Sequence, residues 1–75
     1  MKKKVISSYK FARILTEVGR RNQHTFILRD SNNAPKMVVF DIYHKGFLYR
    51  YEQWIKLEGW KFPARYYRYD LREEM

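Results

Sequence analysis

Aromatic and basic side chains alternate through the second half of the chain, and this is the pattern that could do chemistry. Ten of the fourteen Phe, Trp and Tyr residues lie between Tyr43 and Tyr69, among several lysines and arginines. Aromatic rings stack on unpaired bases, at about 1–3 kcal/mol per base, and Lys and Arg neutralise phosphates. In the densest stretch, Arg65-Tyr-Tyr-Arg-Tyr69, an extended backbone would place a ring and a cation on each face. The pattern predicts a nucleic-acid-binding surface.

A packing role competes with this interpretation for several of the rings. We expect Phe47, Trp54, Trp60 and Phe62 to belong to the core, because large apolar rings are usually buried. Tyrosines can also pack with the hydroxyl group at the rim.

A second basic group lies in the N-terminal part of the chain. Lys2, Lys3 and Lys4 are candidates for an arm that grips phosphate, or simply for a solubilising start. Arg20 and Arg21 suit either phosphate contact or the C-terminal end of a helix. The residues predicted to contact nucleic acid are Lys3, Lys4, Arg20, Arg21, Lys45, Arg50, Lys61, Arg65, Tyr66, Tyr67 and Arg68.

The residue inventory argues against catalysis, a metal or a cofactor. There is no cysteine, and His24 and His44 lie in different segments with only Asp30 and Asp41 near them. A structural zinc site needs four suitable ligands. The three glycines are isolated, so no phosphate-cradling loop is present, and the serines lack a nearby base. We expect a protein that is not an enzyme.

Charge is the strongest compositional signal. Sixteen Lys and Arg oppose eight Asp and Glu, a net charge of +8. Residues 1–69 hold fifteen of these cations and five of the anions, a net +10, which leaves an acidic tail at 70–75. Self-repulsion of this size is tolerated where the partner is a polyanion.

Length and apolar content predict one small basic domain over residues 1–75, with residues 1–5 as a basic arm. No window approaches the roughly 18 consecutive apolar residues of a membrane span. The lack of cysteine favours the cytoplasm.

Residues 8–19 have the spacing of an amphipathic helix. Phe11, Ile14, Leu15 and Val18 share one stripe. Ser7 or Ser8 can cap the start, and Gly19 suits the end. A strand is the alternative, because Ala12, Ile14, Thr16 and Val18 also alternate.

An antiparallel hairpin is predicted next. Residues 24–29 and 36–43 are rich in β-branched and aromatic side chains, and residues 30–35 contain nearly every turn-forming type. Val38, Phe40 and Ile42 are expected to form its core face.

Residues 47–58 fit either a helix or a strand. The helix aligns Phe47, Tyr51, Trp54 and Ile55, whereas the strand aligns Phe47, Tyr49, Tyr51, Ile55 and Leu57, with Gln53 as the exception. We favour the helix, followed by an extended 60–62 and a last strand at 65–69.

These elements predict an α+β fold, a single-layer antiparallel sheet with two helices in the order α-β-β-α-β. If both helices are instead strands, the alternative is a five-stranded small β-barrel.

Two functions follow. The first is a nucleic-acid-binding accessory or regulatory protein, with DNA or RNA and single or double strand left open. The second is an inhibitor or adaptor that binds an acidic surface of a larger protein, in the style of phage and mobile-element accessory proteins. Tyr, Trp and Arg dominate protein hot spots too, so composition does not separate the two. The edge of the hairpin is also a candidate for pairing in a homodimer.

Overall fold

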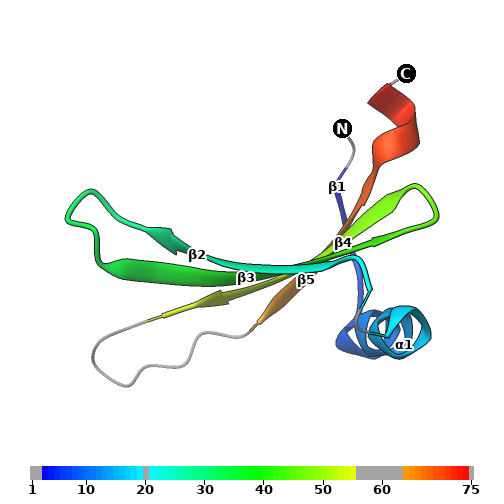
Figure 1. Cartoon of the computed structure of the whole chain (residues 1–75), viewed down its shortest axis with the longest axis horizontal. Coiled ribbons are helices and arrows are strands. Elements are labelled where there is room, and N and C mark those ends of the chain that lie inside the picture. The colour runs from blue at the N-terminus through cyan, green and yellow to red at the C-terminus, as the bar shows by residue number, and fades with distance from the viewer. Residues whose placement is uncertain (1–2, 20, 56–63, 75) are drawn as a thin grey trace.

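The computed structural model describes residues 3–19, 21–55 and 64–74, which form one antiparallel sheet with a helix on one side (Figure 1). The sheet has five strands in the order β1-β5-β4-β3-β2. The elements are β1 (Lys3–Val5), α1 (Ser8–Val18), β2 (Gln23–Arg29), β3 (Pro35–His44), β4 (Phe47–Trp54), β5 (Arg65–Asp70) and the short 3-10 helix η1 (Leu71–Glu74). The α+β class and the antiparallel sheet are therefore confirmed.

α1 forms where the apolar stripe predicts it. The Ser7 side chain caps the helix, because its Oγ accepts a hydrogen bond from the Lys10 backbone N–H at 3.1 Å. Gly19 ends it with φ at 69°, where its N–H donates to the Leu15 carbonyl oxygen. The stripe packs on the sheet through Phe11, which is 6% exposed.

The predicted hairpin is confirmed as β2 and β3. The Asp30 side chain organises its turn, since Oδ1 accepts hydrogen bonds from the backbone N–H groups of Asn32 and Ala34. The strands then pair in register, with Thr25 opposite Phe40.

The second predicted helix is wrong for residues 47–54, which form strand β4. Lys45 and Gly46 have φ angles of 52° and 83°, as in the tight turns that reverse a hairpin. That reversal lays Phe47–Trp54 along β3, and β5 pairs with the other side of the same strand. Two neighbouring strands satisfy its backbone, so sheet pairing prevails over helical spacing. The extended segment predicted at 60–62 lies outside the described residues.

The five-stranded barrel alternative is wrong, because residues 8–18 form α1, the fifth strand is β1, and the sheet is open. β1 and β2 are the two edges of an open sheet, so the described strands form no closed barrel.

The first and the last described strands, β1 and β5, pair with each other in the sheet. Lys3–Val5, predicted as part of an arm, instead pair with β5, with Lys4 opposite Arg68. The predicted last strand is confirmed as Arg65–Asp70, and the described part of the acidic tail continues as η1.

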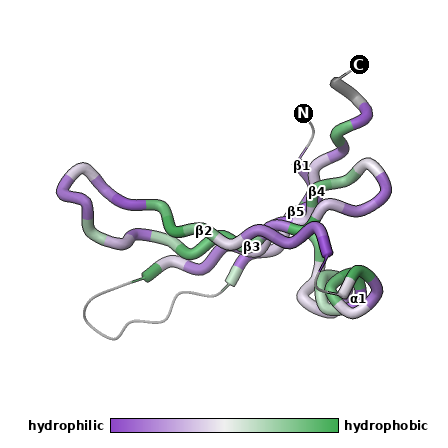
Figure 2. Tube along the Cα trace, in the orientation of Figure 1, coloured by the Kyte–Doolittle hydropathy of each residue, from purple (hydrophilic) through white to green (hydrophobic). Residues whose placement is uncertain are grey.

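The main core lies between α1 and the sheet. Ile6, Phe11, Ile42 and Tyr49 are its buried members. The side chains packed around them are Ile14, Leu15, Val18, Phe40, Phe47, Tyr51 and Tyr66. Phe40 and Ile42 thus occupy the predicted core face, but Val39, on the opposite face of β3, is also buried at 1% exposed. Figure 2 shows α1 beside one end of the sheet only, with hydrophobic stretches of β2 and β3 extending away from it.

Candidate nucleic-acid interface

The sheet has one face that none of the other described elements covers, and we call it the open face. Residues paired across neighbouring strands share a face, so the row His24, Asp41, Arg50 and Tyr67 defines it. Its members are Lys3, Val5, His24, Phe26, Leu28, Met37, Val39, Asp41, Tyr43, Leu48, Arg50, Glu52, Trp54, Arg65, Tyr67 and Tyr69. The α1 core uses the alternate positions and therefore lies on the other face.

An ion pair lies at the centre of the open face. Arg50 donates from Nε to Asp41 Oδ1 at 2.7 Å and from Nη2 to Oδ2 at 2.8 Å. Asp41 is 2% exposed, and the Arg50 side chain is 26% exposed. The hydrogen bond to Asp41 raises the pKa of Arg50 above its ordinary value, although burial works in the opposite direction.

Two rings from distant strands flank this guanidinium group. The Arg50 Cζ atom lies 5.8 Å from the ring centroid of Phe26 on β2 and 5.7 Å from that of Tyr69 on β5. β2 and β5 lie on opposite sides of the β3–β4 pair, so rings from both halves of the twisted sheet lie near its middle. The two hydrogen bonds hold the Arg50 guanidinium group against Asp41, so this carboxylate is buried without a covering helix.

The exposed rings are not the ones that the sequence pattern singled out. Tyr66 packs under α1, with its ring centroid 5.3 Å from that of Phe11. Tyr67 lies on the open face but is only 7% exposed, and Lys3 Nζ lies 4.5 Å from its ring centroid. The exposed rings of the open face are instead Tyr43 at 46% and Trp54 at 38%.

Sequence reasoning missed Tyr43 and assigned Trp54 to the core. The alternation along each strand was the signal available, because Tyr43 falls on the face opposite Phe40 and Ile42. For Trp54 that signal needed β4 to be a strand, and the helical interpretation hid it.

The predicted cations are divided between the two faces. Lys3, Arg50 and Arg65 lie on the open face. Lys4 and Arg68 lie on the helix side, where the Arg68 Cζ atom is 4.7 Å from the Phe47 ring centroid.

Two further predicted cations, Arg21 and Lys45, lie in turns. Arg21 is in the turn before β2, and Lys45 is in the β3–β4 turn, with Nζ 4.0 Å from Glu17 Oε1. Arg20 and Lys61 lie outside the described residues.

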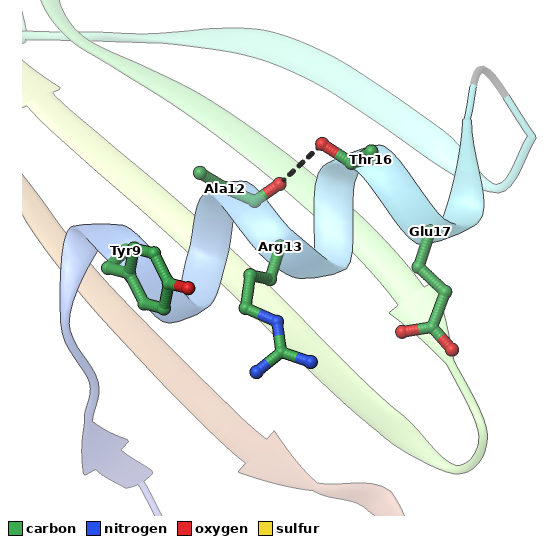
Figure 3. Close-up of a pocket in the computed structure, with 5 residues that line it drawn as sticks. All are labelled: Tyr9, Ala12, Arg13, Thr16 and Glu17. Carbon is green, nitrogen blue, oxygen red and sulfur yellow. Dashed lines mark hydrogen bonds between the residues drawn. The ribbon is translucent and has the colours of Figure 1, made fainter.

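The outer side of α1 carries a shallow hollow of about 350 Å³ (Figure 3). Its lining comes from α1 alone, namely Tyr9, Ala12, Arg13, Thr16 and Glu17. The Thr16 hydroxyl donates to the Ala12 carbonyl oxygen at 3.0 Å, and Glu17 Oε1 lies 3.6 Å from His44 Nε2. The hollow pairs no nucleophile with a base. The described residues also contain no cluster of three or more His, Cys, Asp or Glu side chains that could hold a metal ion.

Known proteins provide no comparison for the open face. The chain matches no protein-family model, no curated protein and no solved structure. Among the described residues, no helix is long and apolar enough to span a membrane.

Proposed function

We propose that this protein binds nucleic acid on the open face of its sheet, without catalysis. The observation that carries the proposal is the combination of exposed Tyr43 and Trp54 rings with cations on the same face and beside it. Single-stranded nucleic acid fits best, since its bases are free to stack on such rings.

The two rings are suitably placed for a strand that crosses the face. Trp54 pairs with Met37, six positions along β3 from Tyr43. At about 3.3 Å per residue, the two rings lie roughly 20 Å apart along the sheet. That span accommodates several nucleotides, with a base stacked near each end.

The neighbouring cations supply the phosphate contacts. Lys3 and Arg65 lie on the open face, and Lys36 Nζ lies 5.3 Å from the Trp54 ring centroid. Within the described part of the chain, none of these three forms an ion pair with an acidic side chain. Their charge is available to an anionic partner, in a chain whose net charge is +8.

The test is a titration of a labelled single strand and its duplex at several salt concentrations. We expect the logarithm of the single-strand affinity to fall linearly with the logarithm of salt concentration, with a slope near −0.7 per phosphate neutralised. Tyr43→Ala and Trp54→Ala should each weaken binding by about 5–150-fold. Lys3→Ala with Arg65→Ala should flatten the salt slope.

Matched controls lie on α1. Tyr9 is 73% exposed but belongs to the other side of the molecule, so Tyr9→Ala should leave affinity unchanged. Lys10→Ala with Arg13→Ala removes the same charge as the open-face pair and should change the slope less.

Two results would overturn the proposal. One is the absence of binding to either form at low salt. The other is a loss of binding in the α1 variants but not in the open-face variants. If a nuclease-treated pull-down then retains a stoichiometric protein, the open face binds an acidic protein surface instead.

A further inference from the structure

We propose that Arg50 recognises a guanine base on the open face, through the edge of its guanidinium group that Asp41 leaves free. This inference rests on the proposed nucleic-acid binding and names the base that the face selects.

Asp41 occupies only part of the hydrogen-bond donors of the Arg50 guanidinium group. Asp41 accepts hydrogen bonds from Nε and Nη2, which lie along one side of the guanidinium plane. The remaining donors are the N–H groups of Nη1 and the outer N–H of Nη2, and they point away from the carboxylate.

The remaining donors of Arg50 are accessible from the open face. Within the described residues, Arg50 hydrogen-bonds to Asp41 alone, and no buried side-chain nitrogen or oxygen lacks a partner. Nη1 therefore reaches the solvent, consistent with the 26% exposure of the side chain. A ligand on the open face can reach this edge without breaking the ion pair.

The Arg50 guanidinium group is held in one orientation by its neighbours. Asp41 is 2% exposed and holds two of the guanidinium nitrogens. Phe26 and Tyr69 flank the group at 5.8 and 5.7 Å from Cζ. Little conformational freedom is left to lose when a ligand binds, and such preorganisation favours selectivity.

The free edge of Arg50 suits a neutral hydrogen-bond acceptor better than a phosphate. The Asp41 carboxylate offsets the positive charge of Arg50 and repels a phosphate placed beside it. A neutral pair of acceptors is better matched to the free edge. Guanine presents that pair at O6 and N7, whereas adenine has a donor in place of O6.

The position of Arg50 also suits a base. Tyr43 is two residues beyond Asp41 on the same face of β3, about 7 Å along the strand. A base stacked on Tyr43 would place its neighbour over Arg50.

The experiment measures binding of the full chain to short oligothymidine strands that carry one central guanine, 7-deazaguanine, inosine or adenine. We expect guanine to be preferred over adenine by about 5–150-fold. Inosine keeps O6 and N7 and should retain the preference, whereas 7-deazaguanine lacks N7 and should lose most of it.

Arg50→Lys keeps the charge but loses the planar fork, so it should bind all four strands alike. Arg13→Lys makes the same change on α1, outside the open face, and is the matched control that should keep the preference. The comparison of strands on the unmodified chain needs no variant, so it stays decisive if Arg50→Lys folds poorly.

Equal binding of all four strands by the unmodified chain would overturn the guanine inference and leave the proposed function intact. A preference lost with inosine but kept with 7-deazaguanine would also overturn it, because a different edge of the base would then be read. Failure to bind any strand at low salt would instead reject the proposed function.

Discussion

Asp41 is an acidic side chain buried at 2% exposed in a face that no described helix covers. Its two hydrogen bonds to Arg50 compensate for the loss of hydration. The contribution of the pair to stability can therefore be measured separately from the base recognition that we propose for Arg50.

We expect Asp41→Ala to lower the free energy of unfolding by about 2–3 kcal/mol, because the largely buried Arg50 guanidinium group loses its carboxylate partner. Replacing both partners, as Asp41→Val with Arg50→Met, should recover most of the loss, since no unpaired charge is left. Urea denaturation followed by tryptophan fluorescence measures both variants. A double variant as unstable as Asp41→Ala would contradict the explanation.

A second carboxylate has a pH dependence with a definite sign. The side-chain hydrogen bonds from Arg72 lower the pKa of Asp70 below its ordinary value. Asp70 therefore contributes to stability above its unfolded-state pKa, and the contribution is lost as the pH falls through the folded value. In an NMR titration, Arg72→Met should move the Asp70 pKa upward. The pKa of Asp70 should still lie somewhat below its ordinary value in this variant, because the backbone N–H of residue 72 also donates to Asp70. An unchanged pKa would exclude the Arg72 side chain as the main cause.

At the scale of elements, α1 is held by its cap and by its contact with the sheet. Phe11 anchors the contact, and its ring lies within 6.2 Å, centroid to centroid, of Phe40 and Tyr51. The N-terminal cap at Ser7 is separable from this packing, because Ser7 is exposed.

We expect Ser7→Ala to destabilise the protein by about 1 kcal/mol, because the Lys10 N–H loses its acceptor. Ser8→Ala is the matched control, since Ser8 is the first residue of the helix and should be nearly neutral when substituted. Thermal and urea unfolding compare the two variants. Equal losses would show that capping does not depend on Ser7.

At the scale of the whole molecule, the sheet joins the two ends of the chain. β1 pairs with β5, with Lys3 opposite Tyr69, and the Ile6 N–H donates to the Tyr66 carbonyl oxygen at 3.0 Å. The first and last strands of the described chain consequently lie side by side (Figure 1). β1 and β2 occupy opposite edges, so α1 crosses the sheet between them.

Deleting residues 2–5 should lower the free energy of unfolding by on the order of 1–2 kcal/mol, because the β1 hydrogen bonds to β5 are lost. The control changes Lys2, Lys3 and Lys4 to Gln, which keeps the strand and removes the charge. It should weaken nucleic-acid binding with little change in stability. If the deletion leaves stability unchanged, these residues act as a free arm and not as a strand.

The amino-acid sequence by itself determined the elements whose signals are local. The apolar stripe of Phe11, Ile14, Leu15 and Val18, with Ser7 and Gly19 at its ends, specifies α1. The turn-forming run at 30–35 likewise specifies the β2–β3 hairpin. In these segments, periodicity and capping act over only a few residues.

Tertiary structure alone decided the rest, because it depends on partners far apart in the chain. The spacing of residues 47–54 fits both a helix and a strand, and pairing with both β3 and β5 selects the strand. That choice turned Trp54 to the open face, while strand pairing buried Tyr67 and packing against α1 partly buried Tyr66. The basic and aromatic composition therefore predicted an anionic partner, but non-local pairing decided which rings and cations can meet it.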